Sequence, residues 1–374
     1  MNTNLSRATF ELIASDETWS ECSRRLQATS AAPLCTPVFC APHWIDAAWQ
    51  WRRPGAKRHF IARADAGRLT GIVPLIQIEE RLLGIRARTL QWLTVPDTQC
   101  ADICTATEDA PSFSEGLANL LAANEVQWDR VQLSHLSNAF PNWRHLGPAL
   151  MRRRLKCVVE PAGENPYVDL TGSFDSYYSG RSRSLKKSVN LSTNRLNKSG
   201  KVDVDWIRGG TATASALADA VRVSSISWKQ QTGSSLDHSG PKAFIGALTA
   251  AADPLGQLSI WLLRLDGKVI ASEYQIISDG NVYALRSDFD PVCAEMSPGT
   301  FLNHYVLKSV FGLGLHRYYM GPGSNAYKLR WTDSFEPLFR LTAYNTTWIG
   351  RMAHWLEQEA RPRLRALRSR ISPP

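Results

Sequence analysis

Residues 281–289 read NVYALRSDF, residues 296–300 read MSPGT, and residues 321–328 read GPGSNAYK. In the first segment apolar and aromatic residues alternate until Asp290-Pro291 interrupts them, which predicts a β-strand. The second segment predicts the start of a helix over 301–312, with a short strand expected at 317–320. The third segment is a glycine-rich loop that ends on an aromatic residue and a lysine. Strand, helix and strand in this order are typical of an α/β unit.

The start of this helix is a candidate anion site. The first turn of a helix presents unpaired N–H groups and a partial positive charge. Gly299 would let an anion such as a phosphate approach the backbone closely. Lys328, at the end of the glycine-rich loop, is placed to supply a second positive contact. Ser-Pro-Gly also occurs at ordinary helix starts, so these residues alone leave both interpretations open.

Composition limits the class of protein. The chain has 374 residues, 44% hydrophobic and 21% charged, which is typical of a globular protein with room for two domains. No apolar run reaches the ~20 residues of a membrane span, and the polar residues 1–9 lead us to expect no signal peptide. The seven irregularly spaced cysteines include no C-x-x-C, so we expect no metal site, no disulfide framework and a cytoplasmic location.

The net charge of +9 favours an anionic ligand, an RNA or an acidic membrane surface. It concentrates in a predicted helix at Ser179–Lys201, where no acidic residue lies between Asp175 and Asp203. The helix is either a solvated surface or a positive wall for phosphate groups. Its basic residues are Arg181, Arg183, Lys186, Lys187, Arg195, Lys198 and Lys201.

The two halves of the chain repeat one order of elements. Strands predicted at 57–64 and 68–80 form a hairpin, as do strands at 258–265 and 269–277. Each hairpin precedes another strand, a helix and a strand, which indicates a duplicated α/β domain. We predict an α/β fold with mixed sheets, a first domain at 1–150, a second at 151–345 and a basic helix or tail at 346–374. Val168–Leu170 is expected to be a short strand, and the polar, glycine-containing segment Thr232–Lys242 is a candidate for a mobile lid.

These features resemble the GCN5-related N-acetyltransferase (GNAT) superfamily, and more closely its double-domain branch, the cellulose-biosynthesis-type or BioF2-like acetyltransferases. The resemblance covers residues 150–345 most clearly, and the first half resembles the degenerate partner domain. The residues that carry it are Phe174–Ser179 with the helix 183–195, the hairpin Leu265–Ala271, Ser297-Pro298-Gly299, Gly321-Pro322-Gly323, Tyr327-Lys328, His43-Trp44 and Gly71–Leu75.

The resemblance implies acetyl-CoA or another acyl-CoA as co-substrate, with its pyrophosphate at the start of the helix. Gly299 matches the second glycine of the family's phosphate loop, whereas Ser297 replaces the first. With Thr300 and Arg286, these residues are the expected cofactor-binding set. The pantetheine arm is expected along the strand Tyr283–Phe289, where it would pair with backbone groups.

An amine would then attack the thioester directly, which requires a base for its proton. Glu273 is our first candidate because an acid in an apolar strand is unusual unless it is paired. Asp288 is the second candidate, and Tyr305 is a candidate acid for the leaving thiolate. A salt bridge is the alternative for Glu273, and packing the alternative for Tyr305. Asn325, Tyr327 and Lys328 are the expected contacts to the acceptor, a small-molecule amine for which an amino sugar, a polyamine and an amino acid are all open.

Two functions of other kinds remain open. Fem-type transferases share the double-domain fold and take an aminoacyl group from a charged tRNA, and the basic helix suits such a partner. The chain could also be a non-catalytic scaffold in polysaccharide or envelope assembly. A basic helix at Trp348–Leu367 would either contact an anionic membrane surface peripherally or dock on the protein itself.

Overall fold

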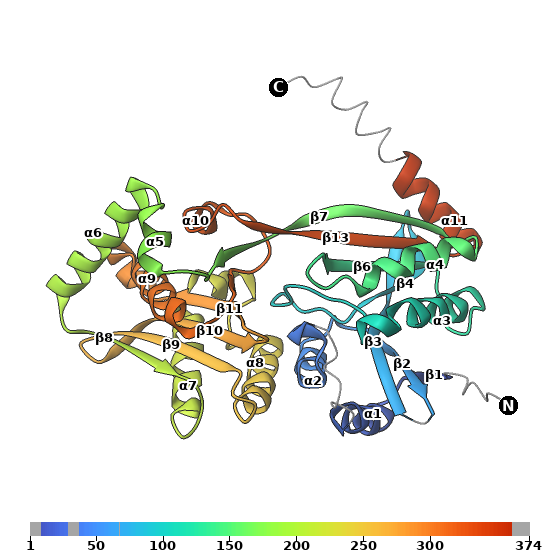
Figure 1. Cartoon of the computed structure of the whole chain (residues 1–374), viewed down its shortest axis with the longest axis horizontal. Coiled ribbons are helices and arrows are strands. Elements are labelled where there is room, and N and C mark those ends of the chain that lie inside the picture. Colours follow the sequence, from blue (N-terminus) through green and yellow to red (C-terminus); the bar gives the residue numbers. More distant parts are fainter. Residues whose placement is uncertain (1–8, 29–36, 67, 361–374) are drawn as a thin grey trace, which may run out of the picture.

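The computed structural model describes residues 9–28, 37–66 and 68–360. Figure 1 shows two lobes joined by two long strands, β7 (Lys156–Asp169) and β13 (Phe335–Tyr344). The described strands form one continuous order, β1-β2-β3-β4-β6-β13-β7-β12-β11-β10-β9-β8, with β5 paired to β3. The predicted α/β fold with mixed sheets is therefore confirmed.

The first lobe is built around the hairpin β2–β3, which continues into β4. Its strands are β1 (Thr9–Ile13), β2 (Lys57–Asp65), β3 (Arg68–Leu82), β4 (Ile85–Trp92), β5 (Cys104–Thr105) and β6 (Arg130–Ser137). Its helices are α1 (Asp16–Ala28), α2 (Pro42–Gln50), α3 (Ala110–Ala122) and α4 (Leu146–Arg152). Helices α3 and α4 cover one face of the sheet and α1 and α2 the other, each face over its own apolar core.

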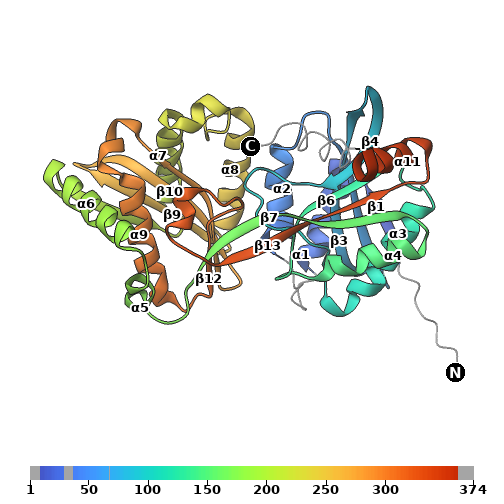
Figure 2. The same ribbon diagram turned by 90° about the horizontal axis from the view of Figure 1, so that it is seen from above.

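The second lobe repeats this plan around the hairpin β9–β10. Its strands are β8 (Val202–Ile207), β9 (Leu258–Leu265), β10 (Lys268–Ser278), β11 (Asn281–Phe289) and β12 (Arg317–Tyr319). Its helices are α5 (Phe174–Ser179), α6 (Arg183–Ser199), α7 (Thr213–Ile226), α8 (Ser239–Ala252), α9 (Pro298–Val310) and α10 (Ala326–Leu329). Helices α6 and α9 cover one face and α7 and α8 the other, as Figure 2 shows from above.

Both lobes contain one pair of parallel strands that meet over only three residues. In the first lobe Thr89–Gln91 pairs with Arg130–Gln132, and in the second Asn281–Tyr283 pairs with Arg317–Tyr319. The first lobe fills the space beyond this pairing with its own chain, since Ala101 bridges Leu136 of β6 and the segment 97–103 is buried. The second lobe has no such segment among its described residues, and a cavity opens there.

The chain end returns to the first lobe. Strand β13 pairs with β6 on one side and β7 on the other, and Leu341 and Ala343 belong to the first lobe's core. Helix α11 (Trp348–Trp355) packs beside it, next to Leu82. The segment 335–345, which the sequence assigned to the second domain, therefore completes the first lobe's sheet. Residues 361–374 of the predicted basic tail lie outside the described residues.

Two local predictions are refined by the structure. The strand predicted at Val168–Leu170 is the end of the long β7, which runs from Lys156 to Asp169 and whose Pro161, Gly163 and Pro166 hide the strand pattern. The segment Thr232–Lys242, the candidate lid, is partly helical. It contains the start of α8, and the Leu236 N–H donates to Ser224 Oγ at 3.0 Å.

Candidate active site

The separation of β11 from β12 creates the candidate site. After Tyr283 the two strands diverge, and β11 continues to Phe289 while the other chain turns at Gly321. The φ of Gly321 is 84°, a left-handed conformation that favours glycine. A cavity of about 490 Å³ lies in this wedge, a size typical of small-molecule sites. The residues that line it include Asp97, Gln99, Trp228, Lys229, Glu273, Arg286, Gly299, Asn303, Tyr318, Asn325, Tyr327 and Lys328.

Glu273 lies at the buried base of the cavity, with 2% of its surface exposed. Its Oε1 accepts hydrogen bonds from Tyr318 OH and from Gln275 Nε2, the latter at 2.5 Å. Gln275 is itself fixed, because its Oε1 accepts from Ser259 Oγ at 2.9 Å and from Trp261 Nε1 at 3.1 Å. The carboxyl group is therefore held in one orientation by side chains from three strands, β9, β10 and β12.

Burial raises the pKa of Glu273 above its ordinary value, and the two hydrogen bonds and Lys229 partly oppose this shift. Burial also raises the pKa of Tyr318, so its hydroxyl keeps its proton at neutral pH. A carboxylate with a raised pKa is a better proton acceptor than an exposed one. No salt-bridge partner of Glu273 is found in the described ranges, 9–28, 37–66 and 68–360.

The start of α9 approaches the cavity from one face of the sheet. Gly299 lines the cavity, and a Cβ added to it would meet only Phe289, at 3.8 Å. Ser297 adopts a left-handed conformation with φ of 54°, and its carbonyl accepts the Thr300 N–H at 3.0 Å. Ser297 and Thr300 thus shape the first turn and are not among the lining residues.

The basic helix α6 supports this first turn. Ser192 Oγ donates to the carbonyls of Met296 and Ser297, at 2.7 and 2.9 Å, and Arg195 donates to the Glu295 carbonyl. Leu185, Val189 and Leu196 are buried, whereas Arg183, Lys187 and Lys198 are exposed. The helix therefore combines an ordinary packed face with a positive surface beside α9.

Three predicted acceptor contacts come from the glycine-rich loop and lie at the cavity. Asn325 is the N-cap of α10 and accepts the Lys328 N–H at 3.1 Å, while Tyr327 is half-buried near Glu273. Lys328 Nζ donates to the carbonyls of Gly321 and Pro322 at 2.6 and 3.0 Å. Burial, and next the charge of Lys229, lower the pKa of Lys328 to about 8.

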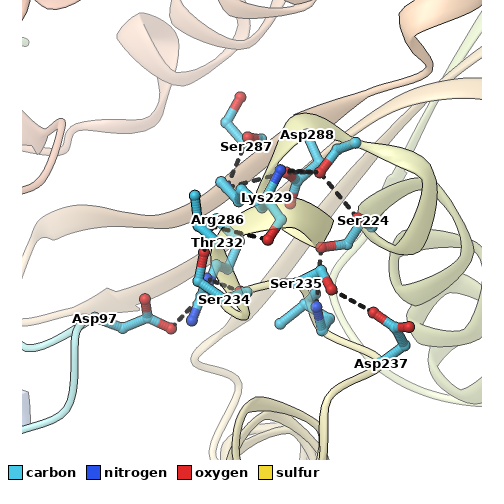
Figure 3. Close-up of polar contacts among 12 residues, drawn as sticks. Asp97, Ser224, Lys229, Thr232, Ser234, Ser235, Asp237, Arg286, Ser287 and Asp288 are labelled. Atoms are coloured by element: carbon cyan, nitrogen blue, oxygen red, sulfur yellow. Dashed lines mark hydrogen bonds and ion pairs between the residues drawn. The ribbon is translucent and has the colours of Figure 1, made fainter.

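A polar network from both lobes closes the other side of the cavity (Figure 3). Arg286 Nε donates to Asp97 Oδ2 at 2.7 Å, and both side chains are buried. Lys229 Nζ lies 3.0 Å from Asp288 Oδ1, and Asp288 also accepts from Ser227 Oγ at 3.1 Å. Asp288, the second predicted base, is therefore engaged by two donors and is not among the lining residues.

Tyr305, the predicted acid, does not reach the cavity. Its side chain is 41% exposed on α9 and meets the ring of Trp261 edge-on. The structure thus brings together Glu273, Arg286, Gly299, Asn325, Tyr327 and Lys328, and leaves Ser297, Thr300, Asp288 and Tyr305 outside the lining.

Sequence reasoning missed several lining residues. Asp97 and Gln99 belong to the buried segment of the first lobe, and Gln99 Nε2 donates to the Ala284 carbonyl of β11 at 2.8 Å. Asn303 comes from the helix predicted at 301–312, and Lys229 from a segment in which no site residue is predicted from the sequence. Tyr318 lies in the predicted short strand at 317–320, where nothing in the sequence distinguishes it from Tyr319.

Two further observations limit the site. Within residues 9–28, 37–66 and 68–360, no three His, Cys, Asp or Glu side chains gather in a way that could hold a metal ion. No helix in the described part of the chain has the length and apolar character of a membrane span.

Comparisons with known proteins agree with this fold. Residues 183–329 match the acetyltransferase (GNAT) domain family. A search of curated protein sequences returns no significant match. The C-terminal domain of a candidate lysylphosphatidylglycerol synthetase from Agrobacterium fabrum is similar in structure, with a TM-score of 0.56, 15% identity and coverage of 90% of this chain and 95% of that one.

FemX is similar with a TM-score of 0.53 and 10% identity, covering 92% of this chain and 99% of that one. L-PGS from Bacillus licheniformis is similar with a TM-score of 0.51 and 13% identity, covering 89% and 93%. At these identities the likeness shows the fold. The chain therefore has the mixed α/β fold of these structures, and residues 183–329 of its second lobe match the GNAT domain family.

Proposed function

We propose that this protein is an acyl-CoA-dependent N-acyltransferase of the BioF2-like branch, which moves an acyl group, acetyl in the simplest case, to an amine of a small metabolite or amino sugar. The observation that carries this proposal is Glu273, held with Tyr318 at the base of the wedge between β11 and β12. The GNAT domain match at residues 183–329 supports the reaction type.

The residues at the wedge suit an acyl-CoA. In the first turn of α9, Pro298 has no N–H, and the Thr300 and Phe301 N–H groups donate to the Ser297 carbonyl. The Gly299 N–H is therefore the one that this turn can offer to a phosphate, and Gly299 keeps the turn open toward the cavity. The backbone of β11 beyond Tyr283 lines the space in which an extended arm would lie. Acyl-CoA would supply the thioester, whose C–S bond breaks as the amine nitrogen forms its bond to the carbonyl carbon.

The chain's own groups handle the protons and the charge. Glu273 accepts the amine proton, directly or through a water, and its raised pKa suits it to this role. Asn303 is buried and lines the cavity, and its Nδ2 has no partner in the described part of the chain, so it is a donor available to a developing oxyanion. Tyr318 fixes the Glu273 carboxylate and keeps its own proton.

A second candidate is transfer of an aminoacyl group from a charged tRNA. It is favoured by the positive surface of α6 beside α9, with Arg183, Lys187 and Lys198 exposed. The similar solved structures include FemX and a candidate lysylphosphatidylglycerol synthetase, which supports the same candidate at the level of the fold.

Turnover assays with both donor classes test the proposal. We expect thiol release from acetyl-CoA or a longer acyl-CoA in the presence of amines, and a fall of about 10²–10⁴-fold in Glu273→Gln. We expect Gly299→Glu to abolish donor binding, because it puts a carboxylate where a phosphate would bind. Gly312→Glu, at an exposed glycine after α9, is the matched control.

Turnover only with aminoacyl-tRNA, lost at high salt, would replace the proposal with the second candidate. Wild-type turnover in Glu273→Gln would remove Glu273 as the base.

A further inference from the structure

The cavity has two chemically different sides because it passes between strands of one sheet. Glu273 is paired with Ser287 across β10 and β11, on the face that α9 covers. Arg286 is paired with Tyr274, on the opposite face, where Tyr274 OH lies 3.0 Å from Thr249 Oγ1 of α8. The side of Glu273 and Gly299 fits the donor, so the side of Arg286 is left for the acceptor.

Arg286 is held from three directions on this acceptor side. Its Nε donates to Asp97 at 2.7 Å, its Nη1 donates to the Ser234 carbonyl at 2.8 Å, and its guanidinium lies 5.1 Å from the centre of the Trp51 ring. Its Nη2 has no hydrogen-bond partner in the described part of the chain, although only 6% of the residue is exposed. A buried donor without a partner destabilises the site, and a ligand that accepts its hydrogen bond would remove this cost.

One cation of the cavity lining has no carboxylate partner in the described part of the chain. Arg286, Lys229 and Lys328 line the cavity, while the carboxylates that pair with them are Asp97 and Asp288. Lys328 is the cation left over, since its Nζ contacts only two backbone carbonyls and no carboxylate in the described ranges. Lys229 is close enough to lower the pKa of Lys328, and a carboxylate bound beside Lys328 would favour its charged form.

We propose that Lys328 Nζ and Arg286 Nη2 form a carboxylate subsite, so that the acceptor is an amine that also carries a carboxylate, an amino acid or a close relative. This inference rests on the proposed function and narrows its acceptor. A carboxylate would give Lys328 a negatively charged partner, and its oxygens would accept a hydrogen bond from Arg286 Nη2. Asp97 is the positioning residue, contributed by the first lobe, that aims Arg286.

The test compares amines that differ only in the carboxylate, lysine with cadaverine and phenylalanine with phenethylamine. We expect the acid of each pair to have a kcat/KM at least about tenfold higher, equivalent to ~1.4 kcal/mol. In Lys328→Met we expect the two members of each pair to have similar kcat/KM, because KM for the acid rises. The double variant Arg286→Gln/Asp97→Asn should have the same effect, and it leaves no buried unpaired charge. Lys308→Met, an exposed lysine of α9 outside the lining, should keep the wild-type ratio.

Equal kcat/KM within each pair, or a Lys328→Met effect equal on both members, would overturn the subsite. If the kcat/KM of phosphoethanolamine exceeds that of ethanolamine by a larger factor than the acids exceed their amines, the subsite binds phosphate, and the proposal that it binds a carboxylate is overturned. If no acyl donor supports turnover, the proposed function fails, and calorimetric binding of the same amine pairs decides the subsite alone. Tighter binding of the acids, lost in Lys328→Met and kept in Lys308→Met, would support it, and equal binding would overturn it.

Discussion

At the scale of single residues, the environment of Glu273 decides what its carboxyl group can do. Burial raises its pKa, while the hydrogen bond from Tyr318 and that from Gln275 lower it. Two opposing effects therefore set the pKa of Glu273: the loss of water around the carboxylate raises it, and the fixed hydrogen-bond donors that replace this water lower it.

This balance predicts the pH dependence of the reaction. Tyr318→Phe removes a donor that favours the carboxylate, so the pKa of Glu273 rises and the acidic limb of the kcat/KM profile moves to higher pH. Tyr177→Phe is the control, because Tyr177 OH donates to the Trp331 carbonyl and does not line the cavity. An unmoved limb in Tyr318→Phe would argue against Glu273 as the titrating base.

Lys328 predicts a dependence of stability on pH. Its pKa is about 8 in the folded chain against an ordinary 10.5, so the unfolded chain binds more protons between these values. The free energy of unfolding gains a favourable contribution from Lys328 as pH rises from 8 to 10.5, and that contribution is absent at lower pH. Chemical denaturation should therefore show that the free energy of unfolding of wild type, relative to that of Lys328→Met, is higher at pH 10 than at pH 7.5. The same difference between the two proteins at both pH values would contradict the lowered pKa of Lys328.

At the scale of elements, each lobe's sheet includes a long strand from the other half of the chain. β7 follows the first lobe in sequence, yet Tyr167–Asp169 pairs with β12 of the second. β13 follows the second lobe, yet it pairs with β6 of the first. Neither lobe completes its sheet without a strand from the other half of the chain, so the lobes are expected to unfold together.

Leu341 in β13 tests this arrangement. It is fully buried in the first lobe's core, so Leu341→Ala should lower the free energy of unfolding by about 2–5 kcal/mol. Hydrogen exchange of backbone amides should become faster in β4 and β6, which lie far from Leu341 in sequence. Leu255→Ala, at a residue that is 56% exposed, should change stability little. Exchange that increases only in β9–β11 would contradict the placement of β13.

At the scale of the whole molecule, the first lobe completes the site of the second. Its own wedge is filled by residues 97–103, and this same segment sends Asp97 and Gln99 to the cavity. Helix α2 packs on α8 at the interface, where Trp44 and Phe244 meet with ring centres 5.2 Å apart (Figure 1). The first lobe thus serves as a wall of the acceptor side.

Gly240 in α8 tests the coupling of interface and site. A Cβ there would lie 2.2 Å from Trp51 Cδ1, so Gly240→Ala should displace the ring that covers Arg286. We expect a loss of about 1–3 kcal/mol in stability together with reduced turnover. Gly246→Ala, on the same helix with nothing within 4 Å of its added Cβ, should instead stabilise by up to ~1 kcal/mol. Equal effects of the two substitutions would contradict the proposed coupling.

The sequence alone determined the features that depend on near neighbours in the chain. Alternation at 281–289 and the turn residues of each hairpin predicted β11 and the hairpins β2–β3 and β9–β10, and the repeated order predicted the tandem fold. Only the tertiary structure decided where β13 lies and that Asp97 meets Arg286, residues 189 positions apart. Such contacts follow from how complete sheets cover their apolar faces, and they leave no periodic pattern because each involves a single residue on each side.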